Sequence, residues 1–299
     1  YQPINFLLTY GLSRIPNVDI IEVYGYSKNF EGFVKKLLSF KKPKIFRLLN
    51  FPDNKTIEFL KINLNFFSRI IVSSQSIKDE LLFNQIPQLN IITLSPLLTM
   101  TRWESAKQIK PLTFLQRPYK ILNVSRMCND EDIKFFLLLA KEILSRNDKV
   151  NFMIVGKKDE KIREFARELG ISHKVDILGW RDDMPEVMAM AHIYISTKAS
   201  SSISRSLFEA MASGVVCVVP DVGGMSDFIN EDTGIVVKRR NLNDYLKAVM
   251  TLISDPVSMQ NISAMGYAYA KANFSAEVVS KVEELVYEEV ITEWVSKYI

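Results

Sequence analysis

The sequence predicts an α/β protein in which helices cover parallel sheets. Residues 119–240 alternate short apolar runs with stretches of helical periodicity, and residues 1–118 repeat this alternation more weakly. The apolar runs are continuous and rich in β-branched residues, which is typical of parallel strands buried on both faces. With 299 residues, 47% of them hydrophobic, the chain is long enough to form two such domains.

In residues 119–240 the apolar runs predict strands at Lys120–Val124, Val150–Val155, Lys174–Leu178, His192–Ser196, Val215–Val219 and Gly234–Val237. The periodicity between them predicts helices over Glu131–Ser145, Asp159–Leu169, Asp182–Ala191 and Ile203–Ser213. Ligands of such sheets bind at the carboxyl ends of the strands. The candidate site residues are therefore those that follow the strands, among them Arg126, Gly156, Trp180, Arg181 and the run from Ser196 to Ser204.

The first half predicts strands at Val18–Tyr24, Lys44–Leu49, Arg69–Ser73 and Asn90–Leu94. A linker is expected from Thr99 to Pro118, where apolar periodicity lapses and prolines interrupt regular structure. Residues 241–299 are expected to be helical, and Ser275 is the expected cap of a last helix whose apolar face carries Val278, Val282, Leu285 and Val286. We therefore expect domains at residues 1–118 and 119–275, with a closing helix over residues 276–299.

The charge is distributed unevenly along the chain. Residues 1–118 hold 16 Lys and Arg against 8 Asp and Glu, whereas the remainder holds 22 against 26. Much of the basic excess lies in Lys35–Arg47, which follows and overlaps an apolar helical pattern and forms a basic amphipathic segment. Contact with an anionic membrane surface is one interpretation, and a helix packed on its own domain with solvated lysines is the other. Nucleic acid is a weaker expectation because no recognised binding motif accompanies the segment.

Other features of the composition narrow the class of protein. No apolar run reaches the roughly 18 residues that span a bilayer, and no signal peptide is recognisable, so we expect a cytoplasmic protein. Cys128 and Cys217 each have apolar neighbours, which favours reduced, buried thiols over a disulfide. The two histidines and the carboxylates show no metal-ligand spacing, so no metal site is expected.

The junction from Ile193 to Gly214 joins a predicted buried strand to a predicted helix through small and polar residues. Backbone N–H groups at a helix N-terminus point outward and carry the positive end of the helix dipole, so such a junction binds phosphate when small residues allow close approach. Arg205 begins the helix, and Glu209 follows one turn later, where it can accept from sugar hydroxyls. The alternative is an ordinary strand-to-helix turn capped by serines.

Seven sequence blocks follow one another in the second half: I-L-N-V-S-R, F-M-I-V-G, V-D-I-L-G-W-R-D-D-M-P, A-H-I-Y-I-S, S-L-F-E-A-M-A-S-G-V-V-C-V-V, D-V-G-G-M-S-D-F-I and T-G-I-V-V. In order and spacing, residues 119–299 resemble the C-terminal domain of retaining glycosyltransferases of the GT-B fold, closest to family 4. Residues 1–118 resemble the acceptor domain more loosely, through F-F-S-R-I-I-V-S-S-Q-S-I-K-D-E-L. The resemblance implies two Rossmann-like domains that face each other across a cleft, the first of them short or clipped and without the family's first strand.

The resemblance also implies roles for individual residues. Arg126 matches the arginine that contacts the donor diphosphate, and Glu209 matches the glutamate that accepts from the nucleotide ribose. Trp180 and Arg181 lie where the family holds the base, although a tryptophan there is equally suited to packing. The main chain at Ser202, Ile203, Ser204 and Arg205 is expected to line the phosphate site, and Gly156, on the same rim of the sheet, is a further expected donor-binding residue. Arg126, Ser201 and Glu209 form the predicted catalytic set.

Two departures from the family pattern concern this same site. The first glutamate of the family's Glu, seven residues, Glu pattern falls on Ser201, and the lysine of the phosphate site falls on Glu131, which reverses its charge. The expected activity is a metal-independent transfer of a sugar from a nucleoside diphosphate sugar to a hydroxyl of a glycan, lipid or protein acceptor, with retention and without a further cofactor. The alternative is a non-catalytic subunit that binds nucleotide, an acceptor protein or an active partner transferase. Oligomerisation is also possible on this interpretation.

Overall fold

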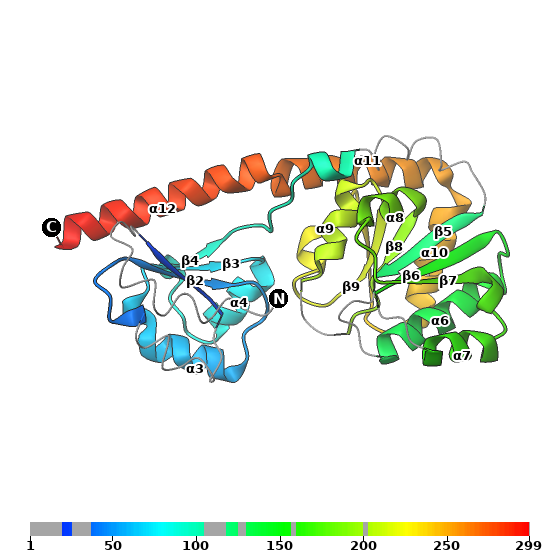
Figure 1. The fold of residues 1–299 in the computed structure, drawn as a ribbon, viewed down its shortest axis with the longest axis horizontal. Helices are drawn as coiled ribbons and strands as arrows, with labels where there is room; N and C mark the ends of the chain where they lie inside the picture. The colour runs from blue at the N-terminus through cyan, green and yellow to red at the C-terminus, as the bar shows by residue number, and fades with distance from the viewer. Residues whose placement is uncertain are drawn as a thin grey trace. The chain divides into compact units, whose positions relative to one another are not determined.

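A computed structural model of the chain describes residues 20–25, 37–104, 118–124, 130–156, 160–199 and 203–298. The chain forms two compact units, called here unit 1 (residues 1–96 and 279–299) and unit 2 (residues 97–278). Each unit contains a sheet whose described strands are all parallel, which confirms the predicted α/β class (Figure 1). The change of unit at Pro96 lies before the predicted linker, and the division into domains at residue 118 stays a prediction.

Unit 1 is built on a sheet in the order β1-β2-β3-β4. Its strands are β1 (Ile21–Tyr24), β2 (Lys44–Leu48), β3 (Arg69–Val72) and β4 (Ile91–Thr93). The described helices are α3 (Asn54–Asn63), α4 (Gln75–Phe83) and most of α12 (Ala276–Tyr298), with short 3₁₀ helices η3 (Leu64–Phe66) and η4 (Gln88–Asn90). All four strand predictions for this half are confirmed within two residues at the ends that the structure describes.

Polar side chains mark where the helices of unit 1 begin. An oxygen of Asp53 accepts from the N–H of Thr56 at 2.8 Å at the start of α3, and the hydroxyl of Ser74 accepts from the N–H of Ile77 at 3.4 Å at the start of α4. The hydroxyl of Ser275 accepts from the N–H of Val278 at 3.4 Å, which confirms the predicted cap of the last helix. Each of these bonds satisfies one N–H that the first helical turn leaves without a backbone partner.

The predicted apolar face of α12 is wrong in three of its four residues. Val278, Val282 and Leu285 are 41%, 42% and 58% exposed, and only Val286 is buried. The buried stripe is instead Val279, Val286 and Val290, which pack against Ile45, Ile71 and Leu94 of the unit 1 sheet. Apolar residues occur on more than one side of this helix, so its periodicity alone does not identify the side that packs.

The basic segment Lys35–Arg47 is not one surface helix. Lys35 and Lys36 lie outside the described residues, and Lys44 and Arg47 are buried in β2. The ammonium group of Lys44 donates to the carbonyl of Lys42 at 2.9 Å, and burial lowers its pKa. Only Lys41 and Lys42 remain at least partly exposed among the described cations of the segment.

Unit 2 is built on a sheet in the order β10-β9-β8-β5-β6-β7. Its strands are β5 (Tyr119–Val124), β6 (Val150–Val155), β7 (Val175–Gly179), β8 (Ile193–Ile195), β9 (Val216–Pro220) and β10 (Gly234–Val237). Its described helices are α6 (Asp130–Leu144), α7 (Glu160–Glu168), α8 (Met184–Met190), α9 (Arg205–Ala212), α10 (Leu242–Ser254) and α11 (Pro256–Phe274), with 3₁₀ turns η5 (Ser172–Lys174) and η6 (Ser226–Phe228). Every strand and helix predicted between residues 119 and 240 is present.

Helices cover both faces of the unit 2 sheet, as continuous apolar strands require. On one face α6, α7 and α10 bury a core that includes Phe136, Phe152 and Val249. On the other face α8, α9 and the end of α11 bury Leu122, Phe208 and Phe274. Residues of the predicted linker belong to this second core, because Met100 and Trp103 are 8% and 2% exposed. Residues 105–117 of that linker lie outside the described residues.

Within the described part of the chain, no helix has both the length and the apolar composition needed to cross a membrane. The longest, α12, carries six glutamates along its length. Cys217 is buried in β9, and burial raises its pKa, so this thiol is held in its neutral form. Cys128 lies outside the described residues.

The packing of α12 predicts that two neighbouring substitutions differ in their effect on stability. Val286→Ala removes two methyl groups from the interior and is expected to lower the free energy of unfolding of unit 1 by about 1–2 kcal/mol. Leu285→Ala is the matched control and is expected to change it by less than about 0.5 kcal/mol, because Leu285 is 58% exposed. Thermal melting of both variants measures the difference. A larger loss for Leu285→Ala than for Val286→Ala contradicts the observed face.

Candidate functional site

The order of strands in unit 2 creates a switch point between β5 and β8. From β5 the chain moves outward through β6 to β7 and then returns to the other side of β5, where β8 pairs with it. Helices α6 and α9, which follow β5 and β8, therefore lie on opposite faces of the sheet, and doubly wound sheets bind ligands at such a switch point. The predicted phosphate residues follow these two strands: Arg126 after β5, and Ser201 to Arg205 after β8.

Hydrogen bonds hold the first residues after β8 in place. The side-chain amide of Asn123 donates to the carbonyl of Ile195 at 2.8 Å, and the hydroxyl of Thr197 donates to the carbonyl of Asp132 at 2.8 Å. The hydroxyl of Tyr245 donates to the carbonyl of Ser196 at 2.8 Å in the interior. Because these bonds are buried, they bind this segment to β5, α6 and α10 more firmly than exposed bonds would.

Further along, the guanidinium of Arg239 donates to the carbonyl of Ala199 at 3.1 Å, and the N–H of Arg239 donates to the carboxylate of Asp221 at 2.7 Å. Ser196, Thr197 and Ala199 therefore each have a hydrogen-bond partner outside this segment. Arg126, Ser201 and Ser202 lie outside the described residues, so their predicted roles stay predictions.

Helix α9 begins beside this segment with Ser204 as its N-cap residue. The Ser204 side chain makes no capping bond to a main-chain N–H within the described residues, and its hydroxyl lies 2.7 Å from that of Ser206. The Ser206 hydroxyl in turn lies 2.9 Å from that of buried Tyr194. Since the Ser204 hydroxyl is engaged with another side chain, it does not compete for the N–H groups of the first turn, and this arrangement is compatible with an anion there.

Glu209 lies on α9 one turn after Arg205. Its side chain is 15% exposed, and its carboxylate is 3.3 Å from the guanidinium Nε of Arg205, which is 73% exposed. Ile203 and Ser204 are partly buried. A carboxylate with little solvent contact is a strong hydrogen-bond acceptor, so Glu209 has the chemistry needed to bind sugar hydroxyls.

Gly156 follows β6 and has a φ of 124°, a conformation that glycine adopts far more readily than other residues. Its N–H donates to the carbonyl of Gly179 at 2.8 Å, which ties the ends of β6 and β7 together. Gly156 is therefore one strand away from the switch point, and any side chain at this position would strain the backbone.

Trp180 and Arg181 follow β7, two strands away from β5, at roughly 10 Å by strand spacing. Trp180 is 60% exposed, and its indole N–H donates to Asp182 at 3.0 Å. Arg181 donates from Nε to Asp183 at 2.7 Å, and this pair raises the pKa of Arg181 and lowers that of Asp183. Packing does not account for so exposed a tryptophan, and the base-binding role stays a prediction.

Glu131, which the resemblance predicts to lie at the position of a lysine in the family, is paired with Arg240. The carboxylate of Glu131 is 3.0 Å from Arg240 Nη1, and the buried carboxylate of Asp132 is 3.2 Å from Nη2. These two carboxylates raise the pKa of Arg240. Arg240 has a φ of 52°, which is uncommon outside glycine and costs about 1–2 kcal/mol. Arg240, in the loop that follows β10, thus offsets part of the negative charge of Glu131 and Asp132.

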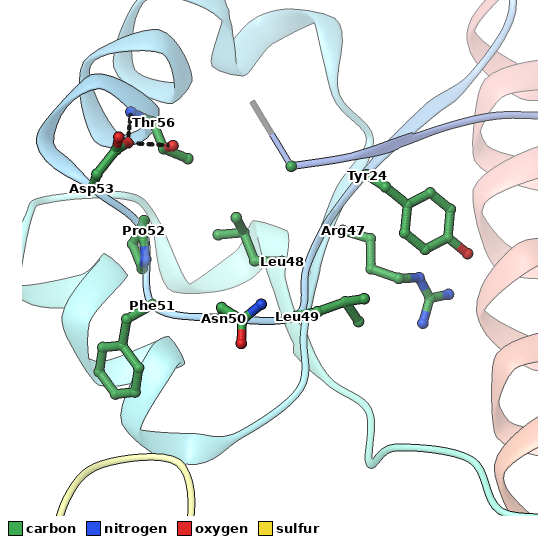
Figure 2. A pocket seen from close by; sticks show the side chains of 10 residues that line it. Tyr24, Arg47, Leu48, Leu49, Asn50, Phe51, Pro52, Asp53 and Thr56 are labelled. Carbon is green, nitrogen blue, oxygen red and sulfur yellow. Dashed lines mark hydrogen bonds between the residues drawn. The ribbon is translucent and has the colours of Figure 1, made fainter. Parts of the chain in front are cut away.

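A pocket of about 410 Å³ lies in unit 1 at the carboxyl ends of β1 and β2. Figure 2 shows Tyr24 and Arg47 on one side of it and Asp53 and Thr56 on the other, with Asn50 and Phe51 between them. Asn50 and the ring of Tyr24 are exposed. The pocket therefore offers an aromatic surface together with amide and carboxylate groups, a combination that suits polar organic ligands.

Arg47 is buried below this pocket and is held by acidic partners within unit 1. Its Nε is 2.6 Å from Glu22, and Nη2 pairs with Glu283 of α12. Partial burial and the Glu22 carboxylate raise the pKa of Tyr24 to about 12, so this phenol stays protonated at neutral pH. The guanidinium of Arg47 lies 5.6 Å from the centre of the Tyr24 ring, which fixes the ring by a cation–π contact.

The sequence did not lead us to the pocket residues Tyr24, Asn50 and Asp53. The signal in the sequence is their position: Tyr24 ends β1, and Asn50 and Asp53 follow β2. Both strands are predicted correctly, and ligands bind at the carboxyl ends of parallel strands. Arg240 was missed for a different reason, since nothing in the local sequence indicates that it reaches α6. Among the described residues, no three His, Cys, Asp or Glu side chains are grouped as metal ligands.

Comparisons with known proteins bear on this geometry. Residues 118–255 match the family described as Glycosyl transferases group 1. The lipopolysaccharide core biosynthesis mannosyltransferase LpsB of Rhizobium meliloti is 23% identical over 133 residues, which cover 44% of this chain and 38% of that protein. The matched part spans less than two-fifths of the curated relatives' own length.

Solved structures match over more of the chain. A glycosyltransferase from Rickettsia africae ESF-5 superposes with a TM-score of 0.77 at 16% identity, covering 96% of this chain and 79% of that one. The Anabaena protein HepE in complex with UDP superposes with a TM-score of 0.73 at 16% identity, covering 89% and 78%. The GT-B fold class is therefore confirmed, as is the resemblance to family 4 that the seven blocks predicted.

The cap of α3 beside the pocket predicts a pH-dependent contribution to stability. Bonds from the hydroxyl and the N–H of Thr56 lower the pKa of Asp53 below its ordinary value of 3.8. The stabilisation is therefore present above the ordinary pKa and is lost as the pH falls through the lowered one. Asp53→Ala is expected to lower the free energy of unfolding of unit 1 by about 1 kcal/mol at pH 7.

The difference between parent and Asp53→Ala is expected to shrink when both are melted at about pH 3 and below. Asp53→Asn is the control, because asparagine caps helices without titrating in this range. An equal difference between parent and Asp53→Ala at both pH values argues against the carboxylate as the stabilising group.

Proposed function

We propose that the chain transfers a sugar from a nucleoside diphosphate sugar to a hydroxyl of an acceptor, with retention of anomeric configuration and without a metal ion. Residues 118–255 match the family described as Glycosyl transferases group 1, the relative LpsB is a mannosyltransferase by name, and HepE has been solved with UDP. The observation that carries the proposal is the position of the switch point. The residues that the family resemblance assigns to the donor diphosphate follow β5 and β8, the two strands between which the sheet changes direction.

In the proposed reaction the bond between the sugar and the diphosphate breaks while negative charge develops on the leaving phosphate. Main-chain N–H groups from Ser202 to Arg205, the α9 dipole and Arg126 stabilise that charge. Arg126 supplies a permanent positive charge and a planar set of donors for the diphosphate oxygens. Glu209 accepts from the ribose hydroxyls and fixes the nucleotide relative to α9. The charge is balanced by protein groups, so the reaction as proposed needs no metal.

The acceptor is proposed to use the pocket of unit 1 at Tyr24, Asn50 and Asp53. Aromatic rings bind the apolar faces of sugars, and amide and carboxylate oxygens accept from hydroxyl groups. Asn50 is exposed, and the Asp53 carboxylate already accepts from Thr56. A glycan, a glycosylated lipid or a glycosylated protein satisfies this chemistry, and all three present hydroxyl groups.

The second candidate function is a non-catalytic subunit that binds a nucleotide, an acceptor protein or an active partner transferase. Ser201 in place of a glutamate is the specific observation that favours it, because a carboxylate near the transferred sugar is then absent. The pairing of Glu131 with Arg240 weighs on the other side, since it offsets part of the negative charge that Glu131 and Asp132 carry there.

The deciding experiment follows nucleoside diphosphate release from a panel of sugar nucleotides, with glycan and lipid acceptors present. Transfer with the anomeric configuration of the donor retained, seen by NMR and unchanged by a chelator, is the expected result. Tight binding of a nucleoside diphosphate without turnover of any donor favours the non-catalytic subunit. Absence of nucleotide binding contradicts sugar transfer and leaves, of the second function, only the binding of an acceptor protein or a partner transferase.

Glu209 is expected to recognise the ribose. Glu209→Ala is expected to weaken binding of the preferred nucleoside diphosphate by about tenfold to a hundredfold, the worth of a hydrogen bond to a charged acceptor. The loss is expected to disappear with the 2′,3′-dideoxy nucleotide, which lacks the hydroxyls. Calorimetry with both ligands measures this, and Glu142→Ala on α6 is the control. An equal loss with both ligands removes the proposed contact.

Arg240 is expected to act by neutralising Glu131. Arg240→Ala is expected to weaken nucleoside diphosphate binding by about tenfold, because an unbalanced carboxylate then lies beside the phosphates. Adding Glu131→Gln in the same chain is expected to restore binding. Arg146→Ala, which breaks an exposed pair with Glu142 at the other end of α6, is the control. A double variant that stays as weak as Arg240→Ala shows that Arg240 acts on the ligand itself.

A further inference from the structure

Four large apolar side chains of unit 1 are highly exposed. Ile62 and Phe66 are 75% and 51% exposed, and Phe83 and Leu89 are 86% and 91% exposed. A single exposed apolar side chain is ordinary on a protein surface, whereas a group of them on one surface marks an interaction site. The position of each side chain in the fold therefore decides whether they form one surface.

The topology brings these four side chains to the same edge of the sheet. Ile62 lies in the last turn of α3 and Phe66 ends η3, shortly before β3 begins at Arg69. Phe83 ends α4, and Leu89 lies in η4, directly before β4 begins at Ile91. Because β2, β3 and β4 are parallel and consecutive, α3 and α4 cover one face of the sheet (Figure 1). Both helices end at the amino-terminal edge of the strands, the edge opposite the pocket.

Three lysines lie at or beside this edge, and the acids near it include Glu58, one turn before Ile62 on α3, and two glutamates of α12. Lys41 and Lys42 precede β2 at this edge, and exposed Lys61 lies next to Ile62. Residues 37–46, 59–70 and 81–92, which form the edge, contain no Asp or Glu. Arg69, at the start of β3, does not add to this group of cations, because it pairs with Glu289 and Glu293 of α12 at 2.7 and 2.6 Å. No carboxylate of the described residues lies within ion-pair distance of Lys41, Lys42 or Lys61.

We propose that this edge patch, defined as Lys41, Lys42, Lys61, Ile62, Phe66, Phe83 and Leu89, binds the surface of a membrane that carries anionic lipids. The apolar side chains enter the boundary between headgroups and acyl chains, and the lysine ammonium groups remain with the lipid phosphates. The patch differs from the segment Lys35–Arg47 of the sequence prediction, because only Lys41 and Lys42 are common to both. It is independent of the sugar transfer proposed above.

The charge argues for a lipid surface over a second copy of the chain. In a symmetric dimer the same surface of each copy meets itself, so the three lysines of one copy would lie near the identical cations of the other. Like charges brought together in this way oppose association. An anionic bilayer supplies the opposite charge over the whole width of the patch, with no requirement for a matching shape.

Vesicle co-sedimentation of the full chain tests the proposal. The vesicles contain phosphatidylcholine alone or phosphatidylcholine mixed with phosphatidylglycerol. The charge variant carries Lys41→Gln, Lys42→Gln and Lys61→Gln, and the apolar variant carries Phe83→Ser and Leu89→Ser. The control variants change three exposed lysines of unit 2 (Lys141→Gln, Lys247→Gln and Lys271→Gln) or two exposed apolar residues of α11 (Val257→Ser and Met265→Ser).

The parent is expected to sediment with the anionic vesicles and not with phosphatidylcholine alone. The charge variant is expected to bind about a hundredfold more weakly and the apolar variant about tenfold more weakly, whereas both controls bind as the parent does. Melting temperatures within a few degrees of the parent establish that the variants are folded. Three results overturn the proposal: a parent that does not bind anionic vesicles, edge variants that bind as well as the parent, and a dimer in sedimentation equilibrium that the apolar variant dissociates.

Discussion

The pairing of β5 with both β6 and β8 is the constraint on which unit 2 depends. The crossover from β5 to β6 and the crossover from β8 to β9 run in opposite directions across the sheet. Because crossovers between parallel strands are right-handed, their helices α6 and α9 lie on opposite faces. The switch point at the carboxyl ends of β5 and β8 follows from this pairing alone. Every residue assigned to the donor phosphates follows one of these strands, so the proposed chemistry depends on main-chain hydrogen bonds far from the reacting atoms.

Near the switch point, ion pairs and hydrogen bonds of two arginines join parts of the chain that are far apart in the sequence. Arg240 reaches α6 from the loop after β10 and meets Glu131 and Asp132, while Arg239 contacts Asp221 and the carbonyl of Ala199. The uncommon φ of Arg240 is part of the same arrangement, because it is maintained only if the surrounding contacts outweigh its cost. Glu131, which falls on the phosphate-site lysine of the family by the resemblance, thus has a cation beside it.

The elements that sequence patterns predicted well are those whose signal is local. Continuous apolar runs identified all ten described strands, and the serine at position 275 identified the start of the last helix. The packed face of α12 was predicted wrongly because that helix has apolar side chains on several sides. Contact with Ile45, Ile71 and Leu94 selects Val279, Val286 and Val290 among them, and those three partners lie about two hundred residues earlier in the chain.

The sequence by itself determined the α/β class, the order of strands and helices in the second half, and the resemblance on which the donor-site assignments rest. These properties depend on hydrophobic periodicity, capping and short motifs, all of which act between residues close in the chain. Only the tertiary structure decided which strands became neighbours, that Glu131 has Arg240 as its partner, and that Phe83 and Leu89 share an edge with Lys41 and Lys61. Such pairs are separated by tens of residues or more, and they form because backbone pairing and burial bring their elements together.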